Sequence, residues 1–195
     1  MRNLLIIKVF FLALAGLAHA QAPSPLAARD TVRQWFQGYE FVPTEGHFKR
    51  MGEHLGPALA AIALDGKDDL LARARAVSAM VYAPGPVTEA VLVQLAQADE
   101  SLLQRKAVEV LALNHGDTHL DLVATVFINA SQDLPLREAA ARALAHMPGE
   151  AALDLRARLH GAEKSPLVKG LLAEHKDVRA PAKATPVGDR FEVVP

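Results

Sequence analysis

The 195-residue chain contains no cysteine, and this absence limits how the protein can be held together. No disulfide can form, and a lipoprotein is excluded because its lipid is attached to an N-terminal cysteine. The folded chain therefore depends on packing alone, and a chain of this length can bury a sizeable core.

Aromatic residues are also scarce, at 5% of the sequence, whereas hydrophobic residues as a whole make up 51%. This hydrophobic content is typical of a folded protein and excludes a disordered one. Leu, Ala and Val dominate it, and Leu and Ala favour helices. Few β-branched runs and few Tyr or Trp residues argue against a β-sandwich. The composition therefore favours an all-α fold.

Clustered basic residues are missing as well, although the chain has 21 Lys and Arg residues in total. Proteins that bind nucleic acids neutralise phosphate groups with clustered basic side chains. We therefore expect no nucleic acid among the partners of this protein.

The first 20 residues have the features of a signal peptide. Arg2 and Lys8 supply positive charge, residues 9–17 form a short apolar core, and residues 18–20 are an A-x-A cleavage site. The alternative is an uncleaved membrane anchor, but Lys8 leaves only roughly ten consecutive apolar residues where about 20 are needed. We predict cleavage before Gln21, export to the periplasm or the extracellular space, and no integral membrane segment afterwards. Cleavage leaves 19 of the 21 basic residues against 22 acidic residues, a formal net charge of −3.

Three segments of the sequence repeat one pattern around the apolar anchors Met80, Leu111 and Leu144, which are 31 and 33 residues apart. Each segment has an acid eleven residues before its anchor, an alanine four before it and a glycine five after it. The acids are Asp69, Glu100 and Asp133, the alanines are Ala76, Ala107 and Ala140, and the glycines are Gly85, Gly116 and Gly149. A pattern that recurs at such a period is typical of repeat architectures.

Each part of the pattern has a role in a helix–turn–helix pair. The acid caps a helix or lies in its first turn, where it accepts hydrogen bonds from free N–H groups. The apolar positions form one stripe on that helix, and the glycine ends it or shapes the following turn. A second helix follows, because apolar residues recur in register at Val91, Leu122 and Leu155. We predict three central helix pairs, with Leu144 buried between repeats.

Weaker helical segments flank these pairs. Upstream, residues 55–64 resemble a second helix, Thr44–Gly52 its first helix, and about Pro25–Tyr39 a further helix with aromatic anchors. Downstream, Ser165-Pro166 is a good helix start, with Ser at the N-cap and Pro at the first helical position.

The domain organisation follows from these segments. After the signal peptide over residues 1–20, we predict an N-terminal helical cap over 21–54, which shields the first repeat. Repeats cover 55–176, and a flexible tail without periodicity covers 177–195. Within the tail, Arg190–Val194 has an alternative role as a strand added to a partner.

The segment Leu136–Leu144 (LREAAARAL) resembles the first-helix signature of a HEAT repeat. That signature is an aliphatic residue, an arginine and then small apolar residues closed by a leucine. Asp133 stands at the acidic position of the family, and Arg137 at its arginine position. Arg73 matches Arg137 in the first unit, whereas Gln104 replaces it in the middle unit.

This resemblance covers about residues 55–174 and implies an architecture without implying a chemistry. HEAT-like proteins stack helix pairs into a curved solenoid, and their second helices usually line the concave side where partners bind. The resemblance implies an all-α solenoid of about four to five antiparallel helix pairs. The chromophore chemistry of phycobilisome-lyase-like relatives does not carry over, because their residues have no match here and no Cys is present.

His115 and His119 are the candidate metal ligands, because two histidines four residues apart share one face of a continuous helix. Gly116, however, predicts a turn between them, with Asp117 or Thr118 as the cap of the next helix. The repeat pattern explains this segment without a metal, and a zinc site needs at least three protein ligands. We therefore predict no metal site and no cofactor.

No established catalytic motif is present either. Residues 65–69 (DGKDD) look like a calcium loop, but they lack the 12-residue spacing and the terminal Glu of an EF-hand. The sequence has no G-x-S-x-G elbow, H-E-x-x-H motif, Walker loop or dinucleotide fingerprint. We predict that the protein is not an enzyme and has no catalytic residues, although a triad assembled from distant segments stays open.

The charged positions of the second helices are the remaining candidates for a binding site. Glu89, Asp121, Asp154 and Arg158 would lie near the concave face of a solenoid and contact a protein partner. Their alternative role is that of a solvated helix surface. We predict a monomeric, exported protein-interaction scaffold. The alternatives are an accessory subunit or enzyme acting on an envelope substrate, and a domain that supports the folding of a neighbouring protein.

Overall fold

The computed structural model describes residues 24–38, 41–130 and 133–173 of the chain. The predicted signal peptide over 1–20 and the predicted tail over 177–195 lie outside these residues. Within the described ranges every regular element is a helix and no strand occurs, which confirms the predicted all-α class. None of the described helices combines the length and the apolar character needed to cross a membrane.

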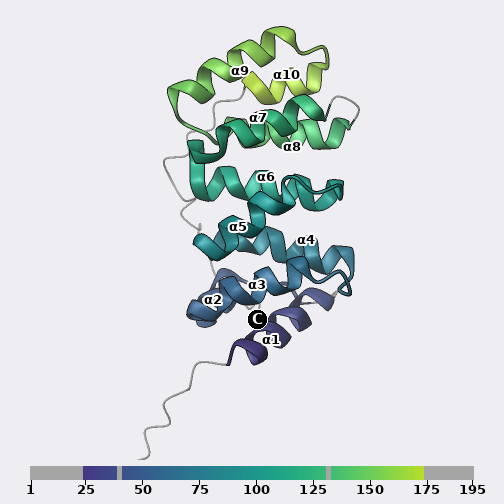
Figure 1. The fold of residues 1–195 in the computed structure, drawn as a ribbon, viewed down its shortest axis with the longest axis vertical. Coiled ribbons are helices and arrows are strands. Elements are labelled where there is room, and N and C mark those ends of the chain that lie inside the picture. Colours follow the sequence, from purple (N-terminus) through teal and green to yellow (C-terminus); the bar gives the residue numbers. More distant parts are fainter. Residues whose placement is uncertain (1–23, 39–40, 131–132, 174–195) are drawn as a thin grey trace, which may run out of the picture.

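The helices follow one another along the molecule in chain order, from α1 at one end to α9 and α10 at the other (Figure 1). The N-terminal elements are α1 (Pro25–Gln37), α2 (Glu45–Arg50), the 3-10 helix η1 (Gly52–His54) and α3 (Leu55–Leu64). The central elements are α4 (Leu70–Ala79), η2 (Met80–Tyr82), α5 (Pro86–Leu95), α6 (Ser101–His115), η3 (Gly116–His119) and α7 (Leu120–Asn129). The C-terminal elements are α8 (Leu134–Ala145), α9 (Glu150–Ala162) and α10 (Pro166–Ala173).

The helices contact one another in a regular order. Each second helix of a predicted pair lies against the first helix that follows it, so α3 packs on α4, α5 on α6, α7 on α8 and α9 on α10. The first helices also contact one another in sequence, from α4 through α6 and α8 to α10. Each pair therefore buries apolar surface against its neighbours.

The repeated acids cap the first helices, as predicted. Asp69 Oδ1 and Asp133 Oδ1 each accept a 2.9 Å hydrogen bond from the backbone amide three residues on. Glu100 Oε1 accepts a longer one, 3.5 Å, from the amide two residues on. Ser101 Oγ also donates to Asp133 Oδ2 at 2.6 Å, which joins the start of α6 to the start of α8. This hydroxyl, together with the Leu136 amide, lowers the pKa of Asp133.

The three repeat glycines lie in the turns between helices, although they occupy different positions there. Gly116 is the C-cap of α6 and has φ 52°, whereas Gly85 and Gly149 are the N-caps of α5 and α9. The prediction that Asp117 or Thr118 caps the next helix is wrong, because both residues belong to η3 and α7 begins only after it. The Asp117 carboxylate instead lies so close to Gly149 that a Cβ atom there would collide with it.

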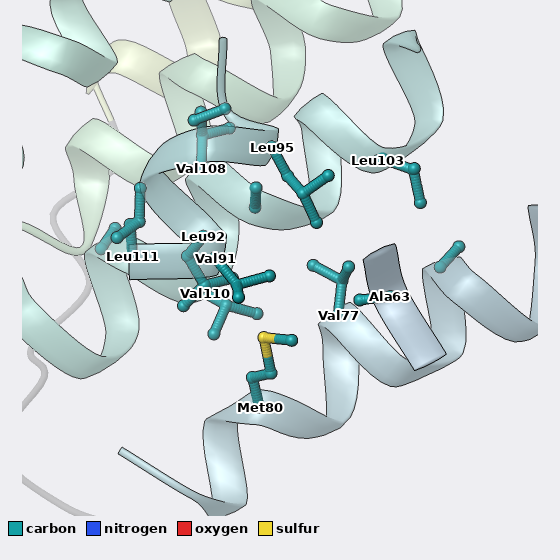
Figure 2. Packing of buried hydrophobic residues seen from close by; sticks show 14 of the residues in the cluster. Ala63, Val77, Met80, Val91, Leu92, Leu95, Leu103, Val108, Val110 and Leu111 are labelled. Carbon is teal, nitrogen blue, oxygen red and sulfur yellow. The ribbon is translucent and has the colours of Figure 1, made fainter. Parts of the chain in front are cut away.

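The anchors of the three repeats form the centre of the core. Met80, Leu111 and Leu144 are all 0% exposed, which confirms the prediction for Leu144. The alanines four residues before these anchors are 0% exposed too, so small side chains let the helices approach closely there. Figure 2 shows Met80 and Val77 directed towards the apolar side chains of α5 and α6.

One polar contact recurs between helices and involves the equivalent positions of Arg73 and Gln104. Arg73 Nε donates a 3.0 Å hydrogen bond to the carbonyl oxygen of Ala63, in the last turn of α3. Gln104 Nε2 donates a 2.9 Å bond to the carbonyl oxygen of Ala96, just after α5. Carbonyl groups at helix C-termini lack intrahelical partners, so both side chains satisfy them. Gln104 therefore makes the same kind of contact as Arg73.

Candidate functional site

Three of the four predicted partner-binding residues are exposed on second helices. Asp121 lies in the first turn of α7, and Asp154 and Arg158 lie one turn apart on α9. No hydrogen bond or ion pair of their side chains occurs in the part of the chain that the structure describes. Asp121 also lines a groove of about 490 Å³ beside the polar side chains of Gln97 and Gln104. These three residues are therefore available to a partner.

Glu89, the fourth predicted residue, is engaged within the protein. Its side chain is 34% exposed, and its Oε1 lies 2.8 Å from His119 Nε2. The other carboxylate oxygen, Oε2, lies 3.7 Å from His115 Nδ1. The structure thus gathers Glu89, His115 and His119 into one group, which we call the Glu–His–His cluster.

The start of α5 fixes the position of Glu89. The preceding residue, Thr88, is 1% exposed, and its hydroxyl donates hydrogen bonds to the carbonyl oxygens of Ala83 at 2.7 Å and Gly85 at 3.0 Å. Pro86 at the first helical position restricts the backbone further. The first turn of α5 is therefore held rigidly, and Glu89 with it.

The end of α6 positions the two histidines. Asn114 Nδ2 donates a 3.0 Å hydrogen bond to the carbonyl oxygen of Met80, which ties the last turn of α6 to η2. His115 is the last residue of α6, and Gly116 then turns the chain at φ 52° into η3. The predicted turn is present, yet it brings His119 back towards His115, with ring centroids 5.6 Å apart and the rings at 80°.

Both histidines are largely removed from water. The exposed fractions of the side chains are 14% for His115 and 17% for His119. His115 Nε2 is buried and has no hydrogen-bond partner among the described residues, and the same holds for Asp117 Oδ1. A buried polar atom without a partner costs about 1–3 kcal/mol. No hydrogen bond among the described residues compensates this cost at His115 Nε2.

The Glu–His–His cluster has the donor set of a metal site. One ligand atom from each of Glu89, His115 and His119 lies within 4.8 Å of the other two. Glu89, which comes from the preceding repeat, was not predicted as a third ligand beside the two histidines. The repeat pattern could have indicated this contact. Glu89 is four residues after Gly85 and His119 is three residues after Gly116, so they occupy similar places in successive repeats, which stack side by side.

A second feature lies at the N-terminal end of the molecule, where aromatic side chains surround an open pocket of about 420 Å³. Phe48 of α2 stacks on Tyr82 of η2, with ring centroids 4.9 Å apart and 17° between the rings. Trp35 of α1 packs edge-on against Phe48 at 5.8 Å. We call this feature the aromatic pocket. Its walls include Trp35, Phe36, Phe41, Val42, Phe48, Leu71, Arg75, Tyr82, Leu102 and Lys106.

The aromatic segment was predicted to be a cap over the first repeat, and two of its aromatic side chains belong to the core. Phe36 and Phe48 are each only 4% exposed and join the core. The rim of the pocket differs, because Phe41, Val42 and Tyr82 are 41%, 79% and 46% exposed. Exposed apolar side chains gathered in one place are typical of interaction sites, so this rim is a candidate binding surface.

Among the residues that the structure describes, the two charged residues that line the aromatic pocket, Arg75 and Lys106, are both basic. Arg75 donates hydrogen bonds to the carbonyl oxygens of Phe36 and Gly38, so it also holds the end of α1. Lys106 of α6 forms a 3.2 Å ion pair with Glu109. The pocket therefore combines an apolar interior with positive charge, although the whole chain carries a formal net charge of −1.

The acidic turn before α4, which looks like a calcium loop in the sequence, binds arginine side chains. Asp65 pairs with Arg29 of α1 at 2.6 Å, and Asp68 pairs with Arg33 at 2.8 Å. The Lys67 amide, and also the charge of Arg29, lower the pKa of Asp65. These acids therefore join α1 to the stack.

No protein-family model, no curated protein and no solved structure matched this chain.

Proposed function

We propose that the protein is an exported, non-enzymatic interaction scaffold, built as a short HEAT-like solenoid, which binds a protein partner. The order of helix contacts supports the solenoid, because α4, α6, α8 and α10 contact one another in sequence. The equivalent capping acids and the equivalent contacts of Arg73 and Gln104 support it as well. Solenoids of this kind offer extended binding surfaces.

The aromatic pocket is the observation that carries the binding proposal. Exposed Phe41, Val42, Leu71 and Tyr82 surround it, and apolar side chains gathered in this way are unusual on a soluble surface unless they bind something. Aromatic side chains, and tyrosine and tryptophan above all, are the residues that most often dominate binding energy at interfaces.

The chemistry of the pocket favours, as its occupant, a polypeptide segment with a bulky apolar side chain next to a carboxylate. The pocket is open at an apolar rim, which suits a segment lying across it better than a small ligand that needs enclosure. Arg75 and Lys106 supply the positive charge that a neighbouring Asp, Glu or C-terminal carboxylate complements.

Asp121, Asp154 and Arg158 are a second contact region in this proposal. They lie on α7 and α9, whereas the pocket is formed by α1, α2, α4, η2 and α6. A partner that occupies the pocket and extends along the second helices contacts both regions. Charge reversal at Asp121 and Asp154 should then weaken binding of the whole partner without affecting a peptide that fills only the pocket.

A random peptide library displayed against the purified protein tests the proposal. We expect enrichment of peptides with a large apolar residue beside an acidic residue or a free C-terminus. Leu71→Glu places a negative charge at the rim and should weaken these peptides at least about 30-fold, as expected for a central interface residue worth about 2 kcal/mol.

Leu167→Glu is the matched control. Leu71 and Leu167 are both the second residue of their helices, α4 and α10, and their exposures are 48% and 57%. Leu167→Glu should leave peptide binding unchanged. A library without enrichment, or peptides that bind Leu71→Glu as tightly as the parent chain, would overturn the proposal.

A further inference from the structure

We propose that Glu89, His115 and His119 bind one divalent transition-metal ion of the zinc class. The proposal is independent of the partner-binding role, because the cluster does not line the aromatic pocket. It differs from the prediction from the sequence, which was that the protein has no metal site and no cofactor.

The chemistry of the three donors selects the ion. Two imidazole nitrogens and one carboxylate oxygen are a ligand set typical of zinc and of other first-row transition ions. Magnesium and calcium prefer oxygen ligands only, so a site with two histidines disfavours them. Three protein ligands also leave at least one position open for water or for a group from a partner.

The distances within the cluster are close to those of a formed site. Two ligand atoms that are each about 2.1 Å from one ion are about 3.0–3.4 Å apart at octahedral or tetrahedral angles. Glu89 Oε1 lies 2.8 Å from His119 Nε2, and the other carboxylate oxygen, Oε2, lies 3.7 Å from His115 Nδ1, so the two distances lie on either side of this range. Because all three ligand atoms lie within 4.8 Å, the most distant pair has to approach by at most about 1.4 Å.

The frame around the cluster is suited to hold an ion. Thr88 fixes the first turn of α5, and Asn114 ties the end of α6 to η2. We therefore expect side-chain rotation, and not movement of a helix, to close the site. A bound ion would join α5 to the corner between α6 and η3, and thus link two successive repeats.

The unsatisfied imidazole of His115 is the observation that points to a missing ligand. The side chain is 14% exposed, its Nε2 has no hydrogen-bond partner among the described residues, and its Nδ1 reaches Glu89 only at 3.7 Å. If the cluster were only a hydrogen-bonded network, this buried ring would have no hydrogen bond to compensate its loss of water. An ion bound at either ring nitrogen would give this buried ring a partner, which Glu89, at 3.7 Å from Nδ1, does not provide.

Calorimetric titration of the chelator-treated, tag-free protein with Zn²⁺ tests the proposal. We expect one ion per chain, an increase in melting temperature on binding, and visible absorption when Co²⁺ replaces Zn²⁺. Glu89→Gln keeps the size of the side chain but removes its charge, and should weaken Zn²⁺ binding at least about 10-fold. His119→Ala removes a ligand and should weaken it at least about 100-fold, since even the loss of an outer-shell partner costs about 10–100-fold.

His160→Ala is the control, because His160 is an exposed histidine on α9, outside the cluster. It should leave the stoichiometry and the affinity for Zn²⁺ unchanged. The Co²⁺ spectrum of the parent chain needs no variant, so the test stands even if His119→Ala fails to fold. Absence of stoichiometric Zn²⁺ binding to the parent chain would overturn the proposal, and so would a Glu89→Gln chain that binds Zn²⁺ like the parent.

Discussion

Leu144→Ala is the substitution that most directly probes the repeat pattern. Leu144 is 0% exposed and lies in α8, which contacts α6, α7 and α10. Replacing a buried leucine with alanine removes transfer free energy and leaves a cavity, and together these cost about 2–5 kcal/mol. The small, fully buried side chains nearby, such as Ala140 at 0% exposure, cannot move far enough to fill the cavity. We therefore expect a loss of about 3 kcal/mol.

Urea unfolding followed by circular dichroism measures this loss as a shift of the midpoint at unchanged m value. In a thermal scan, about 3 kcal/mol corresponds to roughly 6–12 °C for a chain of this size. The matched control is Leu134→Ala at the start of the same helix, where the side chain is 43% exposed and the cost should stay below about 1 kcal/mol. Equal losses for the two variants would refute the assigned pattern of buried positions.

Three further predictions concern polar and glycine positions. Asp133 has a folded pKa below its unfolded value of about 3.9, so its contribution is complete above that pH and is lost as pH falls through the folded pKa. Asp133→Asn should therefore cost about 1 kcal/mol at pH 7 and reduce the acid dependence of unfolding, and Ser101→Ala should raise the pKa of Asp133, measured by NMR titration. Gly149→Ala should cost about 1–3 kcal/mol because its Cβ meets the Asp117 carboxylate, and Asp117→Ala should relieve part of this in a double-mutant cycle of urea unfolding. Gln104→Ala should cost about 0.5–1.5 kcal/mol in the same assay, because it removes the hydrogen bond to the end of α5. Gln104→Arg should keep the stability of the parent chain if an arginine can make the contact that Arg73 makes in the preceding repeat.

Local patterns predicted most of the helical structure. Residues 55–64 correspond to α3 from end to end, and Thr44 is the N-cap of α2, because periodicity and capping are properties of a short stretch of chain. The start of α7 was not predicted. A capping residue at 117 or 118 is locally reasonable, but packing of Asp117 against Gly149, from the next repeat, favours the 3-10 turn instead.

The candidate sites depend on contacts between repeats, and single segments do not reveal such contacts. His115 and His119 stood out in the sequence, yet their third neighbour, Glu89, comes from the preceding second helix. The N-terminal aromatic segment was predicted to shield the first repeat. The structure instead leaves its residue Phe41 exposed in the same pocket as Tyr82, which lies in a later segment of the chain.

The most direct test of the central proposal uses the fluorescence of Trp35, which is the only tryptophan of the chain and lines the aromatic pocket. Titration with a peptide selected from the library should shift Trp35 emission and saturate at one peptide per chain. The same titration of Leu71→Glu should require at least about 30-fold more peptide, whereas Leu167→Glu should behave like the parent. Peptide binding that leaves Trp35 emission unchanged, or that Leu71→Glu does not weaken, would contradict a binding site in this pocket.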